Sequence, residues 1–269
     1  MAVVNRTPDS FYDHGRTFAL DKAVDSALAA AEAGAEWVDI GGVPFSPDRP
    51  DVGLDEELRR VLPVVEGVRA GSDVVISVDT FRAEVARRAV LAGADVINDT
   101  SGLQDPAMVE AVAGSAATLV LAHSLAPPRV HLRKPHYDDV VAEVAGFLRD
   151  RMRAAEAAGI PPERLVVDPG HDLNKNTRHS LELTRRLPEI AALGLPVLAA
   201  VSNKDFVGET LDREQGQRLE GSLAAAVICI MNGARIVRMH DVRAAVDAVR
   251  MTEAVLGFRE PAYLRHNLD

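Results

Sequence analysis

The sequence contains little of what marks several other classes of protein. Among 269 residues it has one cysteine, only 4% aromatic residues and fewer basic than acidic side chains, for a net charge of −10. A single cysteine forms no disulfide within the chain and excludes zinc sites built from several cysteines. We therefore expect a protein of the reducing cytoplasm with a core of Ala, Val, Leu and Ile.

Long hydrophobic runs are missing as well. The longest uncharged apolar stretch, residues 223–231, is far shorter than the roughly 20 residues that a membrane span needs. The first residues carry no basic segment followed by a hydrophobic one, so no targeting signal is expected. The acidic balance argues against nucleic acid or an anionic membrane as the main partner. We predict a small-molecule partner, with no nucleic acid and no membrane.

Eight short runs rich in Val, Ile and Leu alternate with segments of helical periodicity. They lie at residues 1–4, 37–40, 74–78, 95–97, 118–122, 165–167, 196–201 and 235–239. Each run is continuous, which is typical of parallel strands buried on both faces. No G-x-G-x-x-G follows the first run, and the even spacing favours a closed sheet over an open doubly wound one. We predict an α/β fold, a (β/α)8 TIM barrel that forms a single domain over residues 1–269.

The connections between these segments differ in kind. A glycine follows each helix that leads into a strand, which predicts left-handed backbone at Gly34, Gly71, Gly93, Gly114, Gly159, Gly194 and Gly233. The strand-to-helix connections are long at residues 6–19, 42–54, 123–136 and 205–213. Long, varied loops of this kind mark the barrel face that carries an active site.

Polar residues stand at nearly every expected strand end: Asn5, Asp39, Asp79, Asn98, His123, Asp168, Lys204, Arg238 and His240. Each alone also suits a structural role such as a helix cap or, for Asp39, a turn, but together they favour one ligand site. Carboxylate and amide oxygens suit a flat heterocycle with an N–H-rich edge. Lys204 is suited to donate to ring acceptors and Arg238 to stack on the ring. His240 and Asn5 are placed for an anionic tail or a metal-bound phosphate.

Seven motifs in this order resemble the dihydropteroate synthase family: N-R-T-P-D-S-F at 5–11, D-I-G-G at 39–42, S-V-D-T at 77–80, N-D-x-S-G at 98–102, D-P-G at 168–170, S-x-K at 202–204 and R-M-H-D-V at 238–242. The resemblance implies a (β/α)8 barrel, usually a homodimer, and a transferase of folate biosynthesis. Such an enzyme joins a dihydropterin methyl diphosphate to p-aminobenzoate with loss of Mg²⁺-bound diphosphate.

The resemblance also implies roles for the matching positions. Asp79, Asn98, Asp168 and Lys204 would hold the pterin. The catalytic residues would be Asp13, Asp79, Lys204 and His240. Arg238 would lie against the ring. His240 and Asn5 would hold diphosphate and Mg²⁺, with Asn5 as the metal ligand, and Asp13 in the first loop would assist the second step.

The chain departs from the family on one side of this site. Where the family reads D-I-G-G-E-S-T-R-P-G, residues 39–48 read D-I-G-G-V-P-F-S-P-D, so Glu, Thr and Arg become Val43, Phe45 and Ser46. The arginine of S-R-K becomes Asn203, the methionine before the fifth-strand histidine becomes Ala122, and the Gly- and Phe-rich stretch after D-P-G becomes residues 171–175. Losing one charge-assisted contact to diphosphate costs about 1.5–3 kcal/mol. The departures lie on the diphosphate and aminobenzoate side, and the pterin side is intact.

Three hypotheses follow. The first is a homologue that retains the pterin-binding floor and has lost, or strongly reduced, the condensation. The second is a working synthase with altered loops, in which Arg49 or the basic segment 129–136 (Arg129, His131, Arg133, Lys134, His136) replaces the missing cations, although a solvated loop explains that segment more simply. The third is a pterin-dependent methyl carrier or transferase.

Other features of the sequence indicate packing. Cys229 lies among Ala, Val and Ile and is expected to be a buried small hydrophobe. Trp37 is expected between the barrel and a helix. The helix expected over residues 219–231 is apolar on more than one face, which predicts a cover by a second copy of the chain.

Overall fold

The computed structural model describes residues 1–6, 19–44, 48–130 and 132–267. One eight-stranded sheet, in the sequential order β1 to β8, lies at the centre of the molecule, and each neighbouring pair is parallel. The strands are β1 (Ala2–Asn5), β2 (Trp37–Gly41), β3 (Val75–Asp79), β4 (Val96–Asp99), β5 (Thr118–Ala122), β6 (Leu165–Asp168), β7 (Val197–Ala199) and β8 (Ala234–Val237). All eight expected strands are present, with no end shifted by more than two residues.

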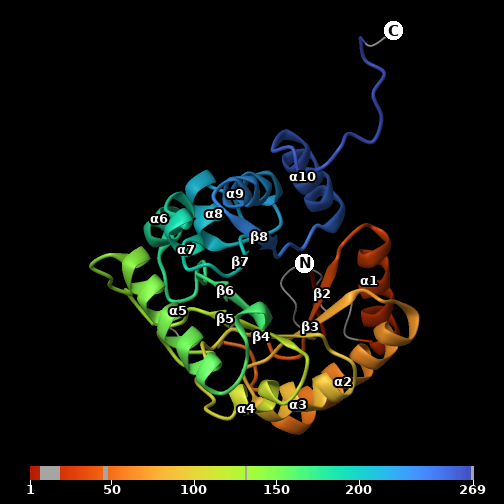
Figure 1. The fold of residues 1–269 in the computed structure, drawn as a ribbon, viewed down its shortest axis with the longest axis vertical. Helices are drawn as coiled ribbons and strands as arrows, with labels where there is room; N and C mark the ends of the chain where they lie inside the picture. The colour runs from red at the N-terminus through yellow and green to blue at the C-terminus, as the bar shows by residue number, and fades with distance from the viewer. Residues whose placement is uncertain (7–18, 45–47, 131, 268–269) are drawn as a thin grey trace.

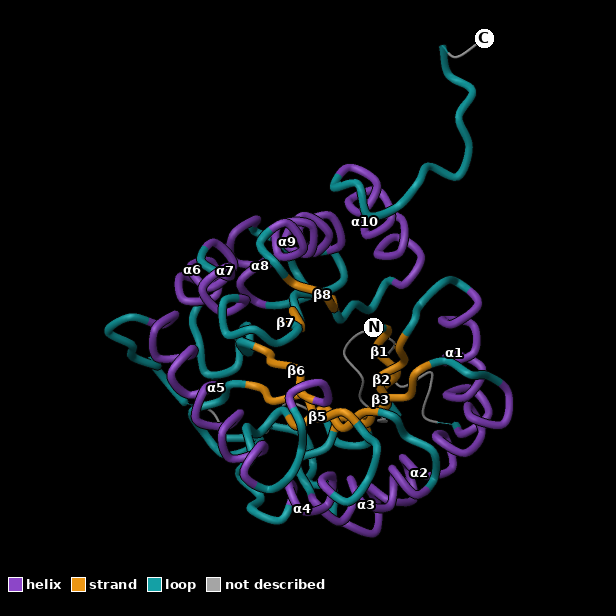
Figure 2. The backbone as a smooth tube through the Cα atoms, in the orientation of Figure 1, coloured by secondary structure: helices purple, strands orange, loops and turns teal. Residues whose placement is uncertain are grey.

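The first and last strands meet beyond the end of β8. Met239 forms a parallel bridge with Ala2, and its carbonyl accepts a hydrogen bond of 3.1 Å from the Val3 N–H. The Met239 N–H in turn donates to the Met1 carbonyl at 2.9 Å. The strands thereby curl around a common centre, inside the helices (Figure 2). The predicted (β/α)8 barrel is confirmed.

Helices surround the strands (Figure 1). They are α1 (Leu20–Glu32), α2 (Leu54–Gly71), α3 (Ala83–Leu91), α4 (Met108–Ala113), α5 (Val140–Ala157), α6 (Thr177–Arg185), α7 (Leu187–Ala191), α8 (Asp205–Leu211), α9 (Leu219–Met231) and α10 (Val242–Val255), with a short 3-10 turn at Pro162–Arg164. None of the helices described has the length and apolar character needed to cross a membrane. The connection at 205–213, expected to be a loop, contains α8.

The interior of the barrel has an apolar lower layer. Val96, Val120, Val166 and Leu198 form a cluster of their own, with Trp37 packed against it. The expectation for Trp37 was therefore wrong. Successive side chains of a strand point to opposite faces, so Trp37 shares the inward face of β2 with Asp39 while Val38 joins the core outside the barrel.

The glycine expectation holds at most of the turns. Gly34, Gly93, Gly159, Gly194 and Gly233 have positive φ. It was wrong at Gly71, the last residue of α2, and at Gly114, whose φ is −75°. At Gly114 the turn is made instead by the Ser115 hydroxyl, which donates to the Val112 carbonyl and accepts from the Ala117 N–H.

At Gly170, in the D-P-G turn after β6, both the backbone conformation and a close contact require glycine. Its φ is +70°, and a Cβ there would overlap the backbone carbonyl of His123. Gly159 offers a comparison, because its φ is +94° and a Cβ would enter open space.

We predict that Gly170→Ala lowers the free energy of unfolding by more than about 3 kcal/mol, because it adds a backbone clash to left-handed strain. Gly159→Ala carries only the strain and should cost about 1–2 kcal/mol. Urea unfolding of both variants measures this. Equal losses would show that the close approach of the turn to His123 is not a constraint.

Candidate ligand site at the carboxyl ends of the strands

The polar strand ends form one layer above the apolar interior. The strand register pairs Asn5 with Gly41, Gly41 with Asp79, and Asp79 with Asn98, so these positions are neighbours at the carboxyl ends of β1 to β4. Asp168 ends β6 and is paired with Ala122. Asp79, Asn98, Asp168 and Arg238, which the sequence predicted to meet, are brought to the same end of the barrel. We call these four residues, with Lys204, the floor.

The centre of the floor is an ion pair between Arg238 and Asp39. The Arg238 Nε donates to Asp39 Oδ2 at 2.6 Å, and its Nη2 lies 3.3 Å from Asp79 Oδ2. Asp39 is fully buried and also accepts from the Ser77 hydroxyl at 2.6 Å and the Asn98 Nδ2 at 3.2 Å. A buried carboxylate needs such a set of partners to offset its desolvation. Asp39, considered above also as a turn residue, anchors the floor from below.

Asn98 is oriented by this anchor. Because its Nδ2 donates to Asp39, its Oδ1 is the atom left to accept, and that atom is buried without a hydrogen-bond partner among the described residues. An unsatisfied buried acceptor costs about 1–3 kcal/mol, which a ligand N–H would recover. The site therefore presents a fixed acceptor to a donor-bearing ligand.

The two carboxyl groups of the floor, Asp79 and Asp168, both have raised pKa values. Burial, with the nearby Asp39 charge, raises the pKa of Asp79 to about 7, while Arg238 opposes the shift. Burial also raises the pKa of Asp168, against the Gly170 N–H, which donates to its Oδ1 at 2.7 Å, and the charge of Lys204. N–H donors of a bound ligand would stabilise the ionised form of both carboxyl groups and so lower their pKa values.

Lys204 enters the site from the start of α8. It is the N-cap residue, and its own side chain makes no capping bond. Asp172, in the turn after β6, supplies the cap, because its Oδ2 accepts from the Phe206 N–H at 3.2 Å while its Oδ1 accepts from the Ser180 hydroxyl at 2.9 Å. Asp172 therefore fixes the segment that carries Lys204.

His240 and Asn5 lie at the neighbouring strand ends. The His240 Nδ1 lies 2.9 Å from the Ser202 hydroxyl, which also accepts from the His240 N–H. A Cβ on Gly41 would come within 3.2 Å of Asn5 Oδ1, so the Asn5 amide lies over that glycine. Asp13 lies outside the described residues.

Among the described residues, Asn5 is the candidate protein ligand for a Mg²⁺ ion. Mg²⁺ prefers six oxygen ligands and is usually bound through one or two carboxylates plus phosphate oxygens. Asn5 offers one amide oxygen, and no group of three His, Cys, Asp or Glu side chains suited to a metal occurs in the described part of the chain.

The basic segment 129–136 is used for contacts between loops. The Arg129 guanidinium donates to the carbonyls of Pro44 and Arg49 in the second loop, and its Nε lies 3.9 Å from Asp51 Oδ1. The exposed His136 pairs with Asp138 at 3.4 Å. Arg133 and Lys134 are exposed, and His131 is outside the described residues. Among the described basic residues of this segment, only Arg129 contacts the second loop.

A buried lysine that the sequence did not single out lies beside the floor. The Lys175 Nζ contacts His123 Nδ1 at 2.8 Å and donates to the carbonyls of Gly170 and Leu173 at 3.0 Å each. Burial lowers the pKa of Lys175 to about 7, and burial together with the Lys175 charge lowers that of His123 to about 3. His123 is thus committed to the structure. Its strand-end position alone could not distinguish this role from ligand binding.

Cys229, in α9, is buried as expected, and burial raises the pKa of its thiol to about 12. A thiol with so high a pKa is not a nucleophile at neutral pH.

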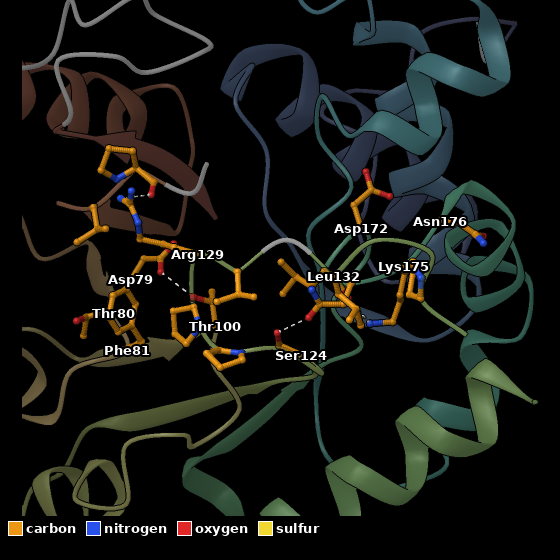
Figure 3. A pocket seen from close by; sticks show the side chains of 18 residues that line it. Asp79, Thr80, Phe81, Thr100, Ser124, Arg129, Leu132, Asp172, Lys175 and Asn176 are labelled. Carbon is orange, nitrogen blue, oxygen red and sulfur yellow. Dashed lines mark hydrogen bonds between the residues drawn. The ribbon is translucent and has the colours of Figure 1, made fainter. Parts of the chain in front are cut away.

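A cavity of about 310 Å³ adjoins the floor at Asp79 (Figure 3). Its walls come from the loops after β3, β4, β5 and β6, with Val43 and Pro44 of the second loop. We call it the side pocket. It gives a ligand seated on the floor room to extend toward the β5–α5 loop.

The barrel and its polar strand ends define a class of protein that binds a small ligand at the carboxyl face. Residues 1–240 match the family described as "Pterin binding enzyme". The chain is 41% identical over 260 residues to the dihydropteroate synthase of Escherichia coli (strain K12), covering 97% of this chain and 92% of that protein. It is 45% identical over 268 residues to a Mycobacterium tuberculosis protein named "Inactive dihydropteroate synthase 2", covering 97% and 84%.

The structure of Xanthomonas albilineans dihydropteroate synthase with 4-aminobenzoic acid matches with a TM-score of 0.88 at 45% identity, over 95% of this chain and 92% of that one. The chain belongs to the pterin-binding enzyme family, among the dihydropteroate synthases and their homologues.

The raised pKa of Asp79 predicts a pH-dependent stability. In the native protein Asp79 holds its proton up to about pH 7, whereas the unfolded carboxyl releases it near its ordinary pKa of 3.8. The resulting stabilisation is present at low pH and is lost as the pH rises through this window. Asp79→Asn does not titrate, so its stability relative to wild type should increase between about pH 4 and about pH 7.

Urea unfolding at several pH values in this window measures the difference. Asp73→Asn, at an exposed carboxylate before β3, serves as the control and should show no such trend. An Asp79→Asn difference that is the same at every pH would contradict the raised pKa of this carboxyl.

Proposed function

We propose that this protein binds a reduced pterin on the floor and that its condensation of dihydropterin diphosphate with p-aminobenzoate is lost or strongly reduced. The observation that carries the first part is the buried Asn98 Oδ1, which has no donor among the described residues while the Nδ2 of the same amide donates to Asp39. A pterin presents a row of N–H groups along its guanidine-like edge, and paired N–H···O bonds to carboxylates and amides are the strong ones.

The floor supplies a role for each of its side chains. Asn98 and the carboxylates of Asp79 and Asp168 accept from the ring N–H groups, and binding of these donors favours ionised Asp79. Lys204 donates to a ring acceptor, and Arg238 offers a planar guanidinium to the ring face. Each interaction positions the ring, and none of them acts on a leaving group.

The second part of the proposal rests on what the site offers a diphosphate. Val43 and Ser46 occupy the family's Glu and Arg positions, and Asn203 occupies another cationic one. Arg129, the described basic residue of segment 129–136 that approaches the region, donates from Nη1 and Nη2 to the carbonyls of Pro44 and Arg49. Removing one preorganised charge contact from a transition state costs about 10²–10³ in turnover. The 45% identical mycobacterial relative is named as inactive, which supports the same interpretation.

The proposal includes a second copy of this chain as partner. Helix α9 buries Ser222, Ala225, Ala226 and Cys229 against the barrel, yet Ile228 and Met231 on its outer side are 47% and 63% exposed. Apolar side chains gathered outside a helix suit a self-complementary contact. We propose a homodimer through α9.

The central experiment combines turnover with binding. The protein is incubated with dihydropterin diphosphate, p-aminobenzoate and Mg²⁺, with dihydropteroate detected by mass spectrometry, and binding of the dihydropterin is followed by calorimetry. We expect binding, and turnover at least about 10²-fold below an active family member assayed alongside. Product at a comparable rate that disappears in Asp79→Asn would establish the alternative, a working synthase with altered loops.

The cap on α8 predicts that Asp172 affects the pterin affinity indirectly, through the position of Lys204. Asp172→Ala removes the acceptor for the Phe206 N–H, so the segment that carries Lys204 loses its fixed position. A lost helix cap costs about 1 kcal/mol. If the ligand must restore this order when it binds, the pterin affinity should fall about fivefold. In a Lys204→Met background, the same change should have no further effect on affinity, because the residue through which it acts is gone.

Calorimetric titration of the four proteins completes this double-mutant cycle. Equal losses from Asp172→Ala with and without Lys204 would mean that Asp172 supports only the fold.

A further inference from the structure

The side pocket differs in chemistry from the floor that it adjoins. The β5–α5 loop contributes Pro127, Pro128, Val130, Leu132 and Pro135 to its wall. Val130 and Leu132 are 51% and 42% exposed, although large apolar side chains normally avoid water. Figure 3 shows Leu132 between Asp79 and Lys175. The β5–α5 loop therefore gives the side pocket an apolar wall.

The cations of this wall are engaged within the protein. The described lining residues include two, Arg129 and Lys175. Arg129 donates to the carbonyls of Pro44 and Arg49, and the Lys175 Nζ is directed at His123 and two carbonyls. Burial also lowers the pKa of Lys175 to about 7, so its charge is only partly present at neutral pH.

The polar side chains that remain in the wall favour neutral ligands. Asp79 and Asp172 bring carboxylates, Thr80, Thr100 and Ser124 bring hydroxyls, and Asn174 and Asn176 bring amides whose oxygens already accept hydrogen bonds within the protein. A diphosphate placed here would face carboxylates without new cationic partners, at a desolvation cost that apolar walls increase. An uncharged, flat or apolar group would instead bury surface against the prolines and Leu132.

We infer that the ligand of this protein is a pterin whose ring substituent is uncharged and apolar or aromatic, and that this substituent lies in the side pocket under the β5–α5 loop. The inference rests on the proposed function, since the floor must hold the pterin for the substituent to reach the pocket past Asp79. It replaces the diphosphate arm of the synthase substrate with one that the described donor set can accommodate.

The test compares pterins that differ only at one ring position: 6-methylpterin, 6-phenylpterin and 6-carboxypterin. Calorimetry or quenching of pterin fluorescence gives the three affinities. We expect 6-phenylpterin to bind at least about tenfold more tightly than 6-methylpterin, from apolar area buried in the side pocket, and 6-carboxypterin to bind more weakly than either.

Two variants locate the effect. Leu132→Ser should remove most of the phenyl advantage while leaving the affinity for 6-methylpterin unchanged. Leu91→Ser, at an 83% exposed leucine on α3 that does not line the pocket, is the matched control and should preserve the advantage.

The outcomes separate the two claims. If 6-methylpterin binds and the phenyl group brings no gain, or if the gain survives Leu132→Ser, the inference about the substituent is overturned while the pterin floor stands. If 6-carboxypterin binds most tightly, the pocket selects anions and the inference is likewise overturned. If none of the three pterins binds, the proposed function itself fails.

Discussion

The site depends on one buried ion pair, between Asp39 and Arg238. Placing a fully buried carboxylate inside a barrel is costly unless its oxygens are satisfied, and here an arginine, a serine and an asparagine satisfy them. This ion pair also orients the rest of the floor, because the same contacts fix the Asn98 amide and hold Arg238 beside Asp79. The polar floor is therefore preorganised before a ligand arrives, which reduces the ordering cost of binding.

Above this floor the protein has two chemically different regions. One is the described part of the second loop and the start of α8, where Val43 and Asn203 stand at positions that the resemblance gives to charged residues. The other is the side pocket, whose apolar wall comes from the β5–α5 loop. Arg129 links the two regions, since it belongs to the fifth loop and hydrogen-bonds carbonyls of the second. The fold is thus that of the family, whereas the departures from the motifs of the resemblance include residues of the loops.

Local sequence patterns predicted the fold well, because continuous apolar runs and helix-terminating glycines are local properties. The same patterns placed Asp79, Asn98 and Asp168 at one end of the barrel. Contacts between distant residues were not accessible: Arg238 and Asp39 are 199 positions apart, Arg129 and Pro44 85, and Lys175 and His123 52. The orientation of Trp37 was predicted wrongly because the prediction assumed that this side chain contacts a helix and did not apply the alternation of side chains along β2. A buried lysine such as Lys175 has no local signature, since its three acceptors come together only in the folded turn.

The most direct test of the account is a crystal structure of the protein with a bound dihydropterin. The account predicts that a nitrogen of the pterin lies about 2.7–3.2 Å from Asn98 Oδ1 and donates its N–H to that oxygen. It also predicts that the Arg238–Asp39 ion pair is unbroken beneath the ring. A pterin bound elsewhere, or one that displaces Arg238 from Asp39, would contradict it.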